Sequence, residues 1–126
     1  MIIRIDTYAE KPIYEQLRDN IILGIASGQL AEGESLPSAR SLAADLGVNF
    51  HTVNKAYDAL RAEDYIVMDR RKTARIAPKK MEATVLPSFV ERLALYAAEA
   101  ICNGVDEKFF TSLCIESYIK AKGGTA

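Results

Sequence analysis

Side chains that can hydrogen-bond to base edges or phosphates gather in two stretches of the chain, residues 38–55 and residues 70–75. An arginine guanidinium is a planar fork that fits O6 and N7 of guanine, and an asparagine amide fits adenine. Lysine, serine, threonine and histidine can donate to phosphate. The first stretch contains Ser38, Arg40, Asn49, His51, Thr52, Asn54 and Lys55. The second contains Arg70, Arg71, Lys72, Thr73 and Arg75. This chemistry is typical of contact with double-stranded DNA.

Several of these side chains also have a purely structural interpretation. Arg40 can pair with Asp45 on a helix surface instead of reading guanine. Ser38 and Asn49 can cap helices, with or without a phosphate contact. His51 can be an ordinary solvated histidine. The basic residues of the second stretch can form a solvated loop.

The first stretch predicts two short helices joined by a tight turn at residues 46–48. The first helix has Leu42, Ala43 and Leu46 on one face, and Gly47 supplies the left-handed residue that ends it. The inward face of the second helix follows a 3.6-residue period and is made of Val53, Ala56, Tyr57 and Leu60. A small residue, a glycine four residues later and a valine six after that are the pattern of a DNA-binding helix-turn-helix.

Elements on both sides of this motif complete a small domain. Residues 2–6 are expected to form a short strand, and Pro12 fits the first turn of a helix whose apolar stripe includes Leu17 and Ile21. Residues 65–76 alternate around a basic turn, which predicts a two-stranded hairpin, or wing. Because its tip at residues 70–73 has neither glycine nor asparagine, we expect a loop longer than two residues.

The rest of the chain predicts two helices. Ser88 to Glu91 has the form of a capping box, Gly104 ends the first helix, and Asp106 caps the second. Two such helices cannot bury their apolar faces alone, so they either pack on the winged domain or pair with a second copy, and we favour pairing. The residues predicted for a dimer interface are Phe89, Leu93, Tyr96, Ala100, Phe109, Phe110, Leu113 and Tyr118.

The predicted fold is mainly α with a small β-hairpin. A winged helix-turn-helix domain occupies residues 1–80, and a short two-helix C-terminal dimerisation region occupies residues 81–126. Net charge is −1, yet residues 70–80 contain six basic residues and no acid, whereas residues 81–126 have a net charge of −2. Basic charge is therefore concentrated beside the helix-turn-helix, as phosphate contact requires.

Composition excludes several other classes of protein. No apolar run approaches the roughly 18 residues of a membrane span, and the N-terminal stretch is too acidic for a signal peptide, so we expect a cytoplasmic protein. With one histidine in the chain, no catalytic or metal-binding constellation is available. We therefore expect no enzyme, no metal and no cofactor. Cys102 and Cys114 are expected to be reduced core residues.

Four motifs resemble the N-terminal domain of the GntR family of bacterial transcription regulators. They are KPIYEQL (11–17), GQLAEGESLPSAR (28–40), LAADLGV (42–48) and NFHTVNKAYDAL (49–60). The short C-terminal region, with AAEAICNGVDEKFF at residues 97–110, is similar to the YtrA subfamily. The resemblance implies a homodimeric repressor, of a kind often encoded with transporter genes.

The resemblance also implies roles for particular residues. Ser38 and Arg40 match the family's DNA-contacting P-S-x-R motif, and Asn49, Phe50, His51 and Thr52 match the start of the recognition helix, which enters the major groove. The wing tip is expected to touch the minor groove. Two departures stand out: the wing lacks the family's glycines, and Phe50 replaces a frequent proline or arginine.

The leading prediction is a sequence-specific DNA-binding regulator, acting as a repressor dimer on a two-fold symmetric operator. The alternative is a winged-helix protein-interaction module that does not bind DNA, suggested by the glycine-free wing and the acidic pI of 5.9. A small-molecule effector is a further possible partner. It would act by shifting the spacing of the two recognition helices.

Overall fold

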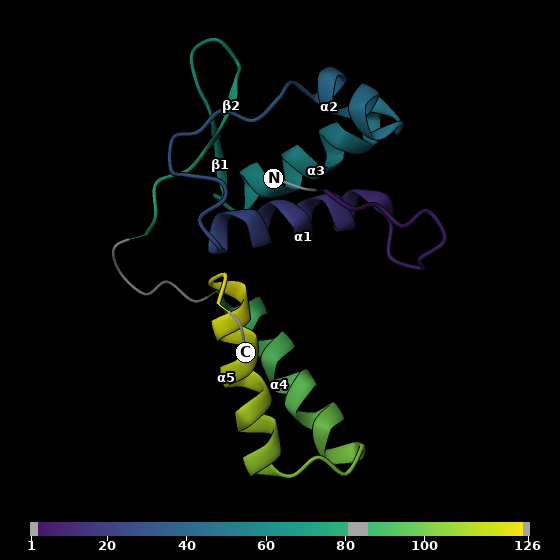
Figure 1. Ribbon diagram of the computed structural model, residues 1–126, viewed down its shortest axis with the longest axis vertical. Helices are drawn as coiled ribbons and strands as arrows, with labels where there is room; N and C mark the ends of the chain where they lie inside the picture. The colour runs from purple at the N-terminus through teal and green to yellow at the C-terminus, as the bar shows by residue number, and fades with distance from the viewer. Residues whose placement is uncertain (1–2, 81–85, 125–126) are drawn as a thin grey trace. The chain divides into compact units, whose positions relative to one another are not determined.

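A computed structural model describes residues 3–80 and 86–124 of the chain (Figure 1). It divides into two compact units, residues 1–79 and residues 80–126. The elements, in chain order, are α1 (Ile13–Ala26), α2 (Ala39–Leu46), α3 (Phe50–Ala62), β1 (Ile66–Met68), β2 (Ala74–Ile76), α4 (Pro87–Cys102) and α5 (Glu107–Ala121). This order confirms the predicted fold of helices with one small hairpin.

The core of the N-terminal unit lies between α1, α3 and the hairpin. Its most deeply buried side chains are Leu17, Ile21, Val53, Leu60, Ile66 and Ile76. The four helix residues recur at four- and seven-residue intervals on α1 and α3, so each helix turns one apolar stripe inward. Leu30 and Leu36, in the loop before α2, belong to the same core.

The turn between α2 and α3 has the predicted geometry. Gly47 lies in the left-handed region with φ of 69°, and its N–H donates to the carbonyl of Ala43. The N–H of Val48 donates to the same carbonyl at 3.0 Å. One carbonyl of the last turn of α2 thus accepts both N–H groups, and the chain turns sharply enough to start α3 at residue 50.

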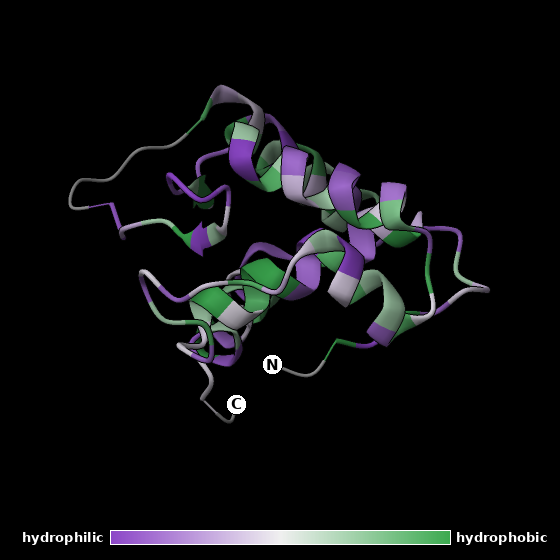
Figure 2. Cartoon of the chain, turned by 90° about the horizontal axis from the view of Figure 1, so that it is seen from above, coloured by the Kyte–Doolittle hydropathy of each residue, from purple (hydrophilic) through white to green (hydrophobic). Residues whose placement is uncertain are grey.

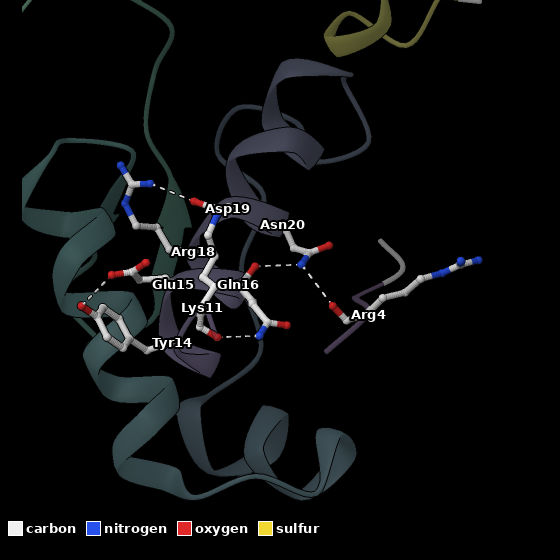
Figure 3. Close-up of polar contacts among 8 residues, drawn as sticks. All are labelled: Arg4, Lys11, Tyr14, Glu15, Gln16, Arg18, Asp19 and Asn20. Carbon is white, nitrogen blue, oxygen red and sulfur yellow. Dashed lines mark hydrogen bonds and ion pairs between the residues drawn. The ribbon is translucent and has the colours of Figure 1, made fainter. Parts of the chain in front are cut away.

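The N-terminal segment differs from the prediction. Residues 3–6 form no strand, and α1 side chains rather than a neighbouring strand bond the backbone of Arg4 and Asp6. Gln16 accepts from the N–H of Asp6 and donates to its carbonyl, at 2.8 and 2.9 Å. Asn20 donates to the carbonyl of Arg4 at 3.4 Å (Figure 3). Pro12 is the N-cap of α1 and not a residue of its first turn.

The hairpin pairs its strands antiparallel, with Val67 opposite Arg75. Residues 69–73 connect the strands, which confirms the prediction of a loop longer than two residues. The outer edge of β2 is also occupied, since Leu36 donates its N–H to the carbonyl of Ala74 at 2.8 Å and Ile76 donates to Glu34 at 2.9 Å. The loop before α2 thus anchors the wing on its second side.

The C-terminal unit consists of α4 and α5. Asp106 caps α5 by accepting from the N–H of Phe109 at 2.8 Å, and Gly104, with φ of 76°, follows the end of α4, both as predicted. The prediction of a capping box at Ser88 is wrong. Pro87 opens α4, because its fixed φ and missing N–H suit the first helical position, so Ser88 already lies inside the helix.

The prediction that the two cysteines are core residues is also wrong. Cys102 and Cys114 are free and exposed, and not part of a core. The reason is that none of the residues that the structure describes in α4 and α5 is buried within this chain. Both cysteines therefore lie on helices that fully bury no described side chain within this chain.

Hydrophobic and hydrophilic residues are interspersed along the helices (Figure 2). Within residues 3–80 and 86–124, no helix is both long and apolar enough to span a membrane. The same residues contain no group of three His, Cys, Asp or Glu side chains that could hold a metal ion.

Candidate nucleic-acid interface

The first turn of α2 presents an arginine close to the start of α3. Ser38 accepts from the N–H of Ser41 at 3.1 Å, so it is the N-cap of the helix. Arg40 follows two residues later and is exposed. Its guanidinium carbon lies over the ring of Phe50, 4.4 Å from the ring centroid. The alternative pairing with Asp45 is absent, because no described carboxylate lies within 4.0 Å of Arg40.

The start of α3 is capped by Asn49. Its Oδ1 accepts from the N–H of His51 at 2.8 Å. The cap uses the carbonyl oxygen, so the amide nitrogen of Asn49 remains the group for another partner. His51 is exposed, and its ring centroid lies 5.3 Å from that of Phe50. Thr52 is half-buried on the same turn. The helix therefore begins with a row of polar groups around one aromatic ring.

One turn further along α3, Asn54 is half-buried and Lys55 is exposed. The ammonium of Lys55 lies over the ring of Tyr14 on α1, 4.1 Å from the centroid. The hydroxyl of Tyr14 donates to Glu15 at 3.3 Å (Figure 3). Desolvation and the neighbouring Glu15 carboxylate raise the pKa of Tyr14. Lys55 is thus held by an aromatic face that leaves its three N–H donors without a carboxylate partner in the described structure.

Tyr57 joins the two helices of the motif from the inside. Its ring is buried, and its hydroxyl donates to the carbonyl of Pro37 at 2.8 Å. Burial raises the pKa of Tyr57 to about 12. This bond fixes the residue before the α2 cap against α3, and so fixes the relative position of the two helix starts.

The wing tip is organised by Asp69, a residue that the sequence did not single out for this role. Its carboxylate accepts from the N–H groups of Arg71 and Thr73 and from Nε of Arg75, each at 2.9 Å. The Thr73 N–H, the Arg75 guanidinium and the Arg71 N–H lower the pKa of Asp69. Lys72 has φ of 60°, so a residue other than glycine takes the left-handed position that this turn needs.

The basic residues of the wing fall into two groups. Arg70, Arg71 and Lys72 are exposed at the tip, and none of them has a carboxylate within 4.0 Å among the described residues. Arg75 instead bonds Asp69 and donates to the carbonyl of Gly33 at 3.1 Å. Among these wing residues, only Arg70, Arg71 and Lys72 can therefore offer all of their side-chain donors to an anion outside the chain.

The predicted site residues therefore lie in three places: the start of α2, the first turns of α3, and the wing. The structure brings the first two together through the contact between Arg40 and Phe50. The predicted dimer residues are separate, on α4 and α5, where six large side chains have exposed fractions between 41% and 70%. These six are Phe89, Leu93, Tyr96, Phe109, Leu113 and Tyr118. Ala100 and Phe110 are half-buried.

Comparison with known proteins relates the chain to transcription regulators. YtrA from Sulfolobus acidocaldarius, described as a GntR-family transcription factor, is 40% identical, with a TM-score of 0.66 over 79% of this chain and 99% of that one. A structure titled as a transcriptional antiterminator from Listeria monocytogenes matches with a TM-score of 0.88 at 29% identity, over 100% of this chain and 96% of that one.

The HTH-type transcriptional regulator Rv1152 from Mycobacterium tuberculosis is 43% identical over 60 residues, which are 48% of this chain. The chain spans 50% of the length of that relative. The relatives are transcription regulators and not enzymes, which confirms the prediction of a non-enzymatic, DNA-binding helix-turn-helix regulator. The model for bacterial regulatory proteins of the gntR family matches residues 11–76. The chain therefore belongs to the GntR family.

Proposed function

We propose that the chain is a repressor that acts in the cytoplasm as a homodimer on a two-fold symmetric operator. The observation that carries this proposal is the position of Arg40. Its guanidinium is exposed at the first turn of α2, beside the start of α3, with no described carboxylate within 4.0 Å. A charged fork left without an acidic partner at the open end of a helix-turn-helix is suited to bidentate contact with guanine.

The residues around Arg40 divide between phosphates and bases. Ser38 has its hydroxyl hydrogen free for a phosphate while its oxygen caps α2. Asn49 offers its amide nitrogen, and His51 and Thr52 offer donors on the same turn. Asn54 and Lys55 extend the contact by one turn, with Asn54 suited to adenine and Lys55 to phosphate.

The wing is proposed to bind through side chains. A wing with glycines can bring its backbone close to DNA, whereas this tip carries Arg70, Arg71 and Lys72. Asp69 bonds the N–H of Thr73 and the guanidinium of Arg75, and the three other basic residues of the wing are exposed. Three exposed cations on a shaped loop fit phosphates or a narrow minor groove.

The C-terminal unit is proposed as the dimerisation region, with the boundary between it and the DNA-binding domain at about residue 80. Six of the predicted interface residues are large apolar side chains that are exposed within one copy, which is typical of a surface that binds a partner. Covering a half-exposed side chain of this size contributes roughly 1 kcal/mol, so twelve such side chains from two copies can support a stable dimer. A second copy also supplies the two-fold axis that a symmetric operator requires.

A protein-interaction module without DNA binding is the competing function. Two observations favour it, the net charge of −1 and the absence of glycine from the wing. The two functions differ in salt dependence. Binding that neutralises phosphates weakens linearly with the logarithm of salt concentration, with a slope of about 0.9 for each phosphate contacted.

The test is selection of duplexes from a random-sequence library by the full chain, followed by fluorescence anisotropy on the enriched duplex and a scrambled one. We expect a two-fold symmetric motif, a steep salt dependence and a dimer in sedimentation velocity. Arg40→Ala should lose preference at one base pair in each half-site. Arg92→Ala, which removes the same charge from α4, should keep it. Equal, weak binding to both duplexes would reject the proposal and favour the interaction module.

A further inference from the structure

We propose that Phe50 is a positioning residue for Arg40, and that this aromatic platform sets how strictly the arginine discriminates its base pair. The inference rests on the proposed DNA-reading function and deepens it. The two residues belong to different helices, Arg40 to the first turn of α2 and Phe50 to the first position of α3. Their contact therefore joins the N-terminal turns of the two helices, which are both proposed to face DNA.

The ring of Phe50 is anchored. It is half-buried and packs against the core of the N-terminal unit, and the His51 ring lies against it at 5.3 Å between centroids, with the two planes 59° apart. The guanidinium carbon of Arg40 lies over this ring at 4.4 Å, well inside the roughly 6 Å range of a cation–π contact. A mobile side chain is thus held against a surface that has little freedom of its own.

The kind of contact matters for recognition. The five donors of a guanidinium lie in its plane, so an aromatic ring beneath its face occupies none of them. A carboxylate such as Asp45 would orient the arginine too, but by binding the donors that a base needs. The structure pairs Arg40 with the ring and with no described carboxylate, which leaves the donors of the fork available.

This role gives a physical reason for an aromatic residue at this position. Arginine loses a large share of its rotamer freedom when it is fixed on a base, and a platform reduces that loss because the free protein is already partly ordered. A leucine at position 50 would keep apolar packing against the core but would lack the ring quadrupole. A tyrosine would keep both, so the two substitutions separate packing from stacking.

The contact itself is tested in the free protein by NMR of the full chain. A ring beneath the arginine shifts the Arg40 Hδ resonances upfield. Phe50→Leu should remove that shift, Phe50→Tyr should keep it, and Tyr8→Leu, which deletes a ring with an exposed fraction of 97%, should not change it. Unshifted Arg40 resonances in the wild type would overturn the inference, whatever the protein does with DNA.

The consequence for recognition is tested by a double-mutant cycle on the enriched duplex. Phe50→Leu should weaken binding about three- to fivefold, the size of an exposed cation–π contact. The same substitution should have no effect in the Arg40→Ala background, because its effect passes through the arginine. Phe50→Tyr should restore binding. In a repeated selection, Phe50→Leu should flatten preference only at the base pair that Arg40→Ala flattens.

The outcomes separate this inference from the function on which it rests. A motif that depends on Arg40, with Phe50→Leu and Arg40→Ala additive, would overturn the positioning role alone. An unenriched library would overturn the DNA-reading function and the positioning role with it. Thermal denaturation of Phe50→Leu checks that the variant is folded, and Phe50→Tyr keeps the test valid if leucine disturbs the core.

Discussion

Replacing Tyr57 by phenylalanine removes one hydroxyl from the interior of the helix-turn-helix. The ring of Tyr57 has an exposed fraction of 8%, and its hydroxyl donates to the carbonyl of Pro37 at 2.8 Å. Phenylalanine fills the same space, so the substitution tests the hydrogen bond and not the packing. Near neutral pH we expect the free energy of unfolding of Tyr57→Phe to fall by about 1 kcal/mol.

The same hydroxyl predicts how this difference changes with pH. Tyrosine in an unfolded chain has a pKa of about 10, whereas burial raises the pKa of Tyr57 to about 12. At alkaline pH the unfolded chain therefore loses a proton that the folded chain keeps. The stabilisation that the Tyr57 hydroxyl gives to the folded state is fully present below the unfolded pKa and is lost as the pH rises through the folded pKa. Between about pH 9 and pH 11 the loss amounts to roughly 1 kcal/mol, which phenylalanine cannot show.

The assay is urea denaturation, followed by far-ultraviolet circular dichroism, of the wild type and Tyr57→Phe near pH 7, 9 and 11. The stability advantage of the wild type should shrink toward zero at the highest pH. Any contribution from the raised pKa of Tyr14 is common to both proteins and cancels. Tyr8→Phe, which changes an exposed ring, should follow the wild type throughout. An advantage that stays constant with pH would refute the assignment of a buried, neutral hydroxyl to Tyr57.

Three further perturbations test the core, the turn and the wing. In urea denaturation, Leu60→Ala should lower the free energy of unfolding by about 2–5 kcal/mol, because the Leu60 side chain is fully buried. The control Leu95→Ala, at a residue that is 59% exposed, should change this free energy little. Gly47→Ala should lower the free energy of unfolding by about 1–2 kcal/mol in the same assay, because φ of 69° is unfavourable for a residue with a Cβ. The added Cβ would meet no atom within 4 Å, so the loss would come from the backbone conformation alone. An unchanged free energy of unfolding would contradict the left-handed geometry. Asp69→Ala should accelerate amide exchange at Thr73 and weaken DNA binding, and unchanged exchange would show that the carboxylate does not shape the wing.

The sequence was sufficient for features that depend on a few neighbouring residues. Ser38, Asn49 and Asp106 cap their helices as predicted, and Gly47 takes the left-handed conformation between α2 and α3. Each of these signals is a hydrogen bond or a backbone conformation that spans no more than about four residues. The absence of glycine in the wing likewise predicted a longer loop correctly, because turn type follows from local φ preferences.

Local signals failed where two of them competed or where a partner was required. Ser88 has the pattern of a cap, but the adjacent Pro87 has the stronger preference for the first helical position. Residues 3–6 have the composition of a strand, yet a strand needs a neighbouring ladder, and here Gln16 bonds the backbone of Asp6 instead. The apolar residues of α4 and α5 were recognised by their period, while their exposure depends on what surrounds them.

The sequence by itself determined the helix-turn-helix and its caps, because periodicity and capping are encoded over short distances, and its motifs carry the resemblance to the GntR family. Only the tertiary structure decided how the charged side chains are used. Arg75 bonds Asp69, Lys55 lies over Tyr14, and Arg40 lies over Phe50. Spacing along the chain cannot predict which partner a long, flexible cation selects, because that choice depends on which rings and carboxylates the fold brings within a few ångströms of it.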